Sequence, residues 1–162
     1  MEYIYIGKIV NTHGIKGEIR ILSNFDLKQD VFKKGINIYI GDNKQKEVIE
    51  SYRHHKNYEM ITMCGYTNIN DVLKFKNKKV YINRLEIESL NDKILKSDII
   101  GMKAFIENEE IGIVEDIYCT GINYEVIEIK NAKDKKLIPY HKDFILSIDV
   151  KESKVIFKGG ML

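Results

Sequence analysis

The sequence contains little cysteine and little proline. Its two cysteines, Cys64 and Cys119, are far apart in the chain, so neither a disulfide framework nor a thiolate zinc site is expected. This cysteine usage fits the reducing environment of the cytoplasm, where we expect the protein to reside. The single proline, Pro139, follows a segment with strand character, and its fixed φ and missing N–H donor suit the end of a strand.

Long apolar runs are also missing. No stretch approaches the roughly 18 consecutive apolar residues that a membrane-spanning helix needs. Residues 1–7 lack the basic region and the extended apolar core of a secretory signal, so we expect the protein to stay in the compartment where it is made. Its 162 residues, 44% hydrophobic and 31% charged, are typical of a soluble globular protein with one ordinary domain or two small ones.

The chain has no strong excess of either charge. Its net charge of +2 is too small to indicate a polyanionic partner by itself. Residues 1–90 contain 15 Lys and Arg against 11 Asp and Glu, whereas residues 91–162 contain 11 against 13. This difference suits a first half that meets RNA and a second half that meets protein.

Alternating apolar residues predict that the chain is mainly β. Ile19 and Ile21 alternate with charged residues, residues 36–40 repeat the pattern, and Val80 and Ile82 lie in a third such run. Each run is typical of a half-buried strand. Turn-forming segments separate the runs at the short intervals seen in barrels: residues 13–17, 41–43, 107–109 and 131–134.

The rest of the pattern predicts two domains and one short helix. The helix is expected from Asn70 to Lys76, with Asn70 as its N-cap. Residues 89–97 are polar and interrupt the strand rhythm, so we place a linker there, between a domain of residues 1–88 and a domain of residues 98–162. The second domain is expected to close into a small barrel. Its predicted strands are Ile99–Ile106, Glu110–Tyr118, Tyr124–Ile129, Leu137–Tyr140, Phe144–Ile148 and Lys154–Phe157.

The most distinctive segment is residues 6–21, in which two glycines flank a hairpin-like connection. On spacing alone, a tight loop that closes a barrel explains it. The functional interpretation places His13, Lys16 and Arg20 near one end of the barrel, where cationic donors meet phosphates. The Gly-Ile-Lys-Gly sequence is not a phosphate loop, because it lacks the P-loop spacing and no long helix follows it.

A second basic segment contains Arg53, His54 and His55. Adjacent residues of a strand point to opposite faces, so the two histidines do not readily ligate one metal ion, and no further ligands lie at a useful spacing. We expect no metal site here. Contact with RNA and local packing explain this segment about equally well.

Lysines and tyrosines leave two interpretations open. Four lysines surround Phe75, and a solvated helix face explains them more simply than RNA binding does. Tyrosine rings can stack on bases, but they also fill the walls of barrels. The sequence does not divide these roles among Tyr3, Tyr5, Tyr39, Tyr52, Tyr58, Tyr66 and Tyr81.

Enzyme signatures are missing from the sequence. It contains no Gly-x-Ser-x-Gly elbow, Walker loop, dinucleotide fingerprint or His-Glu-x-x-His zinc helix. Its carboxylates are scattered, and exposed positions account for them more simply than an acid–base pair does. We therefore expect no catalytic residues and no cofactor.

The first half resembles the RimM family. Gly7-Lys8-Ile9-Val10 and then His-Gly-Ile-Lys-Gly-Glu-Ile-Arg-Ile at residues 13–21 are similar to that family's Gly-Lys strand and its His-Gly-Ile-x-Gly-x-Ile/Val-x-Val pattern. The second half looks like a PRC barrel. The segments that carry this likeness are residues 98–102, 112–114, 120–121, 137–140, 148–149 and 159–162.

The resemblance covers nearly the whole chain. It implies an amino-terminal barrel like the second domains of translation factors and a carboxy-terminal PRC barrel. It also implies an assembly chaperone that binds the head of the immature small ribosomal subunit, through a ribosomal protein there and 16S rRNA, and aids late 16S rRNA maturation without catalysis. We expect a monomer, with contacts to the ribosome or its RNA from His13, Lys16, Arg20, Arg53, His54 and His55.

One segment departs from the family. Many relatives carry a Tyr-Tyr pair just before the second barrel, implicated in subunit binding, where this chain has Ile94 and Leu95. These residues keep an apolar contact but lose the hydroxyl donors and aromatic area. They are our candidates for the ribosomal-protein contact, although linker residues packed on the barrel explain them equally well.

Two other functions are weighed against this one. An RNA-processing enzyme needs a convergent catalytic group or a metal cluster, which the sequence does not display. A general RNA-binding barrel would bind unrelated RNAs equally and show no preference for immature small subunits.

Overall fold

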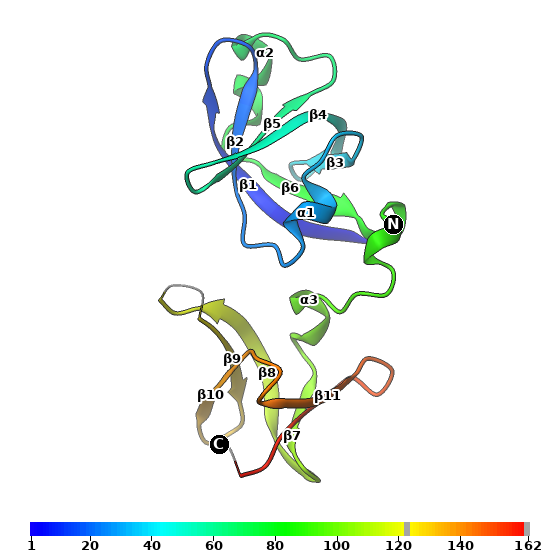
Figure 1. Ribbon diagram of the computed structural model, residues 1–162, viewed down its shortest axis with the longest axis vertical. Helices are drawn as coiled ribbons and strands as arrows, with labels where there is room; N and C mark the ends of the chain where they lie inside the picture. Colours follow the sequence, from blue (N-terminus) through cyan, green and yellow to red (C-terminus); the bar gives the residue numbers. More distant parts are fainter. Residues whose placement is uncertain (122–123, 161–162) are drawn as a thin grey trace. The chain divides into compact units, whose positions relative to one another are not determined.

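The computed structural model describes residues 1–121 and 124–160, and these fold mainly as β-strands, as predicted (Figure 1). The chain divides into two compact units, Met1–Lys93 and Ile94–Leu162, each with its own hydrophobic core. No helix within the described ranges is long and apolar enough to cross a membrane. Met161 and Leu162, part of the terminus that resembles the RimM family, lie outside the described residues.

Six strands of the first unit close into a barrel in the order β1-β2-β5-β4-β3-β6, with every neighbouring pair antiparallel. The strands are β1 (Tyr3–His13), β2 (Glu18–Leu22), β3 (Asn37–Ile40), β4 (Gln45–His55), β5 (Tyr58–Met63) and β6 (Lys79–Asn83). The helical segments are α1 (Lys28–Val31), α2 (Ile69–Val72) and the 3₁₀ turns Leu73–Phe75, Arg84–Glu86 and Glu88–Leu90.

The alternating apolar residues predicted on half-buried strands fill this barrel. Ile19 and Ile21 of β2 are fully buried, as are Ile38 of β3 and Ile82 of β6. Burying a side chain of this size stabilises a fold by roughly 1.5–3 kcal/mol. Since successive side chains of a strand point to opposite faces, the residues between these isoleucines lie on the outside of the barrel.

The helix predicted from Asn70 to Lys76 is wrong in its cap and its length. α2 starts one residue earlier, and a 3₁₀ turn takes over from Leu73 to Phe75. The cap is Asn68, whose Oδ1 accepts a hydrogen bond from the Asn70 N–H at 2.8 Å. Asn68 has the extended backbone that an N-cap requires (φ −137°, ψ 138°), whereas Asn70 is already helical.

Six strands of the second unit form one sheet in the order β10-β9-β8-β7-β12-β11. β7 and β12 pair in parallel, the other neighbours pair antiparallel, and β10 and β11 lie at the two ends of the sheet. The elements are α3 (Lys96–Ile99), β7 (Lys103–Ile106), β8 (Glu109–Cys119), β9 (Glu125–Lys130), β10 (Lys135–Pro139), β11 (Ile145–Asp149) and β12 (Lys154–Phe157).

The start of the second unit differs from the prediction. A strand was expected from Ile99, but Ile99 is the last residue of α3 and the first strand begins at Lys103. Asp98 accounts for this helical turn, because its Oδ2 accepts a hydrogen bond from the Leu95 N–H at 2.8 Å. Pro139 is the last residue of β10, in agreement with its expected place at a strand end.

Candidate nucleic-acid interface

The strand register brings three of the predicted basic residues together. Arg20 of β2 and Arg53 of β4 both lie opposite Met60, on the strand between them. Residues directly opposite in an antiparallel pair share a face of the sheet, so both guanidinium groups project from the same outer side of the barrel. His55 lies on this side too, because it is two residues after Arg53 on β4.

Arg20 is held by two aromatic neighbours. Its Nη2 lies 2.6 Å from Nδ1 of His13, at the end of β1. Because a guanidinium can only donate, Nδ1 of His13 accepts this hydrogen bond. The Arg20 Cζ lies 5.8 Å from the Tyr58 ring centroid, within cation–π range. The Arg20 Nε is buried, with no hydrogen-bond partner among the described residues.

Arg53 is bound to a carboxylate. Its Nε and Nη2 donate to Oε2 and Oε1 of Glu18 at 2.9 and 2.8 Å. This bidentate pair lowers the pKa of Glu18 below 4.5, chiefly through the hydrogen bonds from Arg53, so Glu18 is ionised at neutral pH. The Arg53 side chain remains 48% exposed and keeps further N–H donors for a ligand.

His55 completes the group that we call the cationic face: His13, Arg20, Arg53 and His55. The His55 ring centroid lies 6.1 Å from that of His13. Partial burial, followed by the positive charges of Arg53 and Lys56, lowers the pKa of His55 below 6.5. At neutral pH the face therefore carries two arginine charges beside a mainly uncharged His55.

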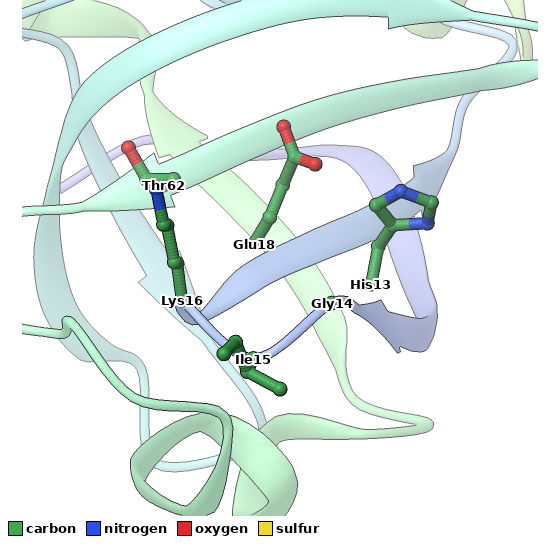
Figure 2. Close-up of a pocket in the computed structure, with 6 residues that line it drawn as sticks. All are labelled: His13, Gly14, Ile15, Lys16, Glu18 and Thr62. Atoms are coloured by element: carbon green, nitrogen blue, oxygen red, sulfur yellow. The ribbon is translucent and has the colours of Figure 1, made fainter.

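Lys16 lies in the loop between β1 and β2, beside a cavity of about 380 Å³. Figure 2 shows its side chain extended next to Thr62, with Glu18 lying between Lys16 and His13 in this view. Ile15, which is 78% exposed, also lines the cavity. The predicted loop residue is thus close to the cationic face, on the same side of β2 as Glu18.

The loop is fixed by contacts with the segment that follows β5. The Ile69 N–H donates to the Ile15 carbonyl at 2.9 Å. Gly17 has a φ of +91°, and a Cβ at this position would lie 3.2 Å from the Tyr66 carbonyl oxygen. Only glycine combines this backbone conformation with so close an approach.

His54 does not belong to the cationic face. Its Nδ1 lies 3.0 Å from Oε1 of Glu59, which also accepts from the Tyr52 hydroxyl at 2.7 Å. Glu59 is only 1% exposed, and Lys28 approaches its other carboxylate oxygen at 3.8 Å. Of the predicted pair, only His55 lies beside Arg53 and His13.

The two residues in place of the family's Tyr-Tyr pair differ in exposure. Ile94 is 40% exposed, whereas Leu95 is fully buried just before α3. A surface contact made by this segment therefore depends mainly on Ile94.

Sequence reasoning missed the acceptors and rings that position the arginines. Glu18 was not identified as a site residue, although alternation places Glu18 and Arg20 on one face of β2, and Tyr58 was not assigned to Arg20. Their partners come from β4 and β5, whose register is set by nonlocal pairing. Within residues 1–121 and 124–160, no group of three or more His, Cys, Asp or Glu residues is placed to hold a metal ion.

The two β units and the cationic face define a two-domain β protein that presents basic side chains on its first barrel. The sequence model of the RimM N-terminal domain matches residues 4–87, and that of the RimM PRC barrel domain matches residues 96–161. The chain therefore belongs to the RimM family, and the prediction of a RimM amino-terminal barrel followed by a PRC barrel is confirmed.

Individual relatives match along nearly their whole length. A protein of Ligilactobacillus salivarius named ribosome maturation factor RimM is 41% identical over 162 residues, which cover 98% of this chain and 96% of the relative. An Exiguobacterium protein of the same name is 37% identical over 160 residues, covering 96% and 93%.

Two solved structures are also similar to this chain. A RimM crystal structure from Pseudomonas aeruginosa is 20% identical, covers 97% of both chains and has a TM-score of 0.45. The solution structure of the N-terminal domain of RimM from Thermus thermophilus is 15% identical, covers 56% of this chain and all of that domain, and has a TM-score of 0.48.

Proposed function

We propose that this chain is a ribosome maturation factor that binds the head of the immature small ribosomal subunit. It contacts a ribosomal protein of the head and 16S rRNA, and it promotes late assembly and efficient 16S rRNA processing without catalysis. It acts in the cytoplasm as a monomer. The observation that carries the RNA contact is the convergence of His13, Arg20, Arg53 and His55 on one outer side of the first barrel.

The cationic face is suited to phosphate groups. Arg20 and Arg53 are each anchored by contacts that use only some of their five N–H groups, so each retains further donors. Lys16, on the adjoining loop, adds a mobile point charge. Contacts of this kind release counterions from RNA, so affinity falls as salt rises.

The contact with a ribosomal protein is assigned to the segment that precedes α3. Ile94 supports this assignment, because its apolar side chain is 40% exposed and follows Lys93 in the chain. Each of the two contacts can be modest. Tethering them in one chain raises the effective concentration of the second once the first has formed.

The test is sedimentation of the tagged full-length protein with precursor and mature small subunits, across a series of salt concentrations. Selective comigration with the precursor, weakened by salt, is the expected result. Equal binding to unrelated RNAs, without preference for precursor particles, would indicate a general RNA-binding barrel. Trimming of precursor rRNA by the purified protein alone would establish an enzyme instead.

A further inference from the structure

A second surface of the first barrel is rich in tyrosine. Tyr5 of β1 lies opposite Tyr81 of β6, which in turn lies opposite Tyr39 of β3. Tyr3 is two residues before Tyr5 and on the same outer side. The ring centroids of Tyr5 and Tyr81 are 6.0 Å apart, those of Tyr3 and Tyr39 are 5.1 Å apart, and both pairs meet edge to face. We call these four residues the tyrosine face.

The four rings divide into supports and exposed rings. Tyr39 is 4% exposed, and its hydroxyl donates to Glu86 at 2.6 Å. Burial, together with this hydrogen bond, raises the pKa of Tyr39 to about 12, so it remains a donor. Tyr5 and Tyr3 are 50% and 36% exposed. An exposed ring fixed by a neighbouring ring has little motion to lose when a ligand stacks on it.

Lysines surround these rings. The Lys44 Nζ lies 4.2 Å from the Tyr81 centroid and 5.6 Å from the Tyr3 centroid, and the Lys79 Nζ lies 5.9 Å from the Tyr5 centroid. Lys44 is held there by the turn between β3 and β4, where it has a φ of +54° and its N–H donates to the Gly41 carbonyl. The aromatic rings thus alternate with positive charge.

A polar cavity of about 420 Å³ adjoins the tyrosine face. Lys79 lines this cavity and also approaches the Tyr5 ring. The Gly41 N–H donates to the Lys79 carbonyl at 2.9 Å, which fixes the turn against β6. The lining residues are Gly41, Asp42, Asn43, Asn77, Lys78 and Lys79. Amide groups and ammonium groups beside exposed tyrosine rings suit the sugar and phosphate of a nucleotide whose base lies on a ring.

We infer that the tyrosine face binds unpaired RNA bases, by stacking on Tyr5 and Tyr3, with Lys44 and Lys79 close to the backbone. The inference deepens the proposed function, on which it rests for the source of the RNA. It adds a contact separate from the cationic face, because Tyr5 lies near the start of β1 and His13 at its end, about 25 Å apart for an extended strand.

Charge favours RNA over a protein partner here. Lys46, opposite Tyr39, and Lys78 add to the positive charge of Lys44 and Lys79. Of the nearby carboxylates, Asp42 lines the cavity beside Lys78 and Lys79, and Glu86 already accepts hydrogen bonds from Tyr39 and from Asn37, so positive charge remains in excess. Stacking requires an open base face, which a duplex does not offer, so the ligand class is single-stranded RNA.

The experiment measures binding of the full-length protein to a labelled single-stranded RNA of about eight nucleotides, within the site sizes known for β-barrel RNA readers. Tyr5→Ala should weaken binding about tenfold, while Tyr5→Phe, which keeps the ring, should stay within about twofold of the wild type. Tyr124→Ala is the matched control, because Tyr124 is 51% exposed in the second unit. Thermal melts verify that each variant is folded.

Two further readouts sharpen the result. The chain contains no tryptophan, so its intrinsic fluorescence comes from tyrosine. Base stacking should quench this emission, and Tyr5→Ala should lose part of the quenching. Lys44→Gln with Lys79→Gln should flatten the salt dependence. Unchanged affinity of folded Tyr5→Ala, or equal competition by duplex RNA, would overturn the inference.

The assay also separates this inference from the proposed function. If the wild type fails to comigrate with precursor subunits but Tyr5→Ala still weakens oligonucleotide binding, the proposed function fails and the stacking site stands. If Tyr5→Ala loses precursor binding while oligonucleotide affinity is unchanged, the face docks a protein and the inference is wrong.

Discussion

Arg53 and Arg20 differ in what their charges already meet. Arg53 faces the Glu18 carboxylate, which neutralises part of its charge, whereas Arg20 faces Nδ1 of His13 and the Tyr58 ring and has no carboxylate partner among the described residues. Glu18 therefore weakens the attraction of the cationic face for phosphate while fixing the geometry of Arg53. These two effects can be separated by substitution.

Replacing Glu18 with Gln should strengthen RNA binding. Removing the negative charge raises the local potential, and we expect affinity to rise about threefold at low salt. The free energy of unfolding should fall by less than about 1 kcal/mol, because the Arg53 partner is half exposed. Fluorescence anisotropy with RNA and urea unfolding give the two quantities. Glu115→Gln, an exposed change in the second unit, is the control, and weaker binding of Glu18→Gln would contradict this account.

The pH dependence of the free energy of unfolding provides a second test of the Glu18–Arg53 pair. The pKa of Glu18 is lower in the folded protein than in the unfolded chain, so the stability from the pair is present above about pH 4.5 and is lost as the pH falls further. The stability difference between the wild type and Glu18→Gln should accordingly shrink below that pH.

His55 should make RNA binding depend on pH. Its pKa is lowered by partial burial and then by nearby cations, and a bound phosphate counteracts the cations. The pKa is then higher in the complex, binding takes up a proton, and affinity should increase as the pH falls from about 7.5 to 6. His55→Gln should flatten this slope. His141→Gln, in the second unit, is the control and should keep the slope of the wild type. If His55→Gln also keeps that slope, His55 is not the source of the pH dependence.

At the scale of elements, regular alternation was predictable and local caps were not. Ile19 and Ile21 face the core as their spacing predicts, because one buried side of a strand requires it. The cap of α2 was assigned to Asn70 in place of Asn68, since two asparagines at this spacing are equivalent until the backbone direction is known. The turn at α3 depends on a hydrogen bond that the Leu95 N–H donates to the Asp98 carboxylate.

The loop between β1 and β2 should be more sensitive at Gly17 than at Gly14. Both have positive φ, but only a Cβ at Gly17 would approach the Tyr66 and Asn68 backbone, at 3.2–3.4 Å. Gly14→Ala should cost about 1 kcal/mol from its backbone conformation alone, and Gly17→Ala should cost more, about 2–3 kcal/mol. Urea unfolding at one temperature compares them. Equal losses would mean that the close approach is relieved by movement of the loop.

At the scale of the whole molecule, the sequence located the basic residues but not their grouping. Arg20 and Arg53 converge only because β5 lies between β2 and β4, a nonlocal arrangement that no spacing along the chain encodes. The same register separates His54 from His55. For the same reason, the sequence could not tell which tyrosines stack on bases and which fill the barrel wall. Tyr5 and Tyr81 are 76 positions apart in the chain yet opposite each other in the barrel.

The two proposed contacts should act independently within one chain. Arg53→Ala and Ile94→Asp should each weaken binding to precursor subunits about tenfold, and the double variant should show the product of the two losses, because the sites share no partner. Raising salt should reduce the effect of Arg53→Ala and leave that of Ile94→Asp. Competition with labelled wild-type protein measures the affinity of the wild type, of the two single variants and of the double variant. A double variant no worse than either single one would place both residues in a single contact.

Closure of the first sheet restricts how other molecules can bind that domain. Every strand from β1 to β6 has a hydrogen-bonded strand on both sides, so an extended peptide has no vacant ladder to join there. β10 and β11 each have one strand neighbour in their sheet. Of the two domains, only the second can therefore bind a peptide by β-strand addition, in which the peptide pairs with an edge strand.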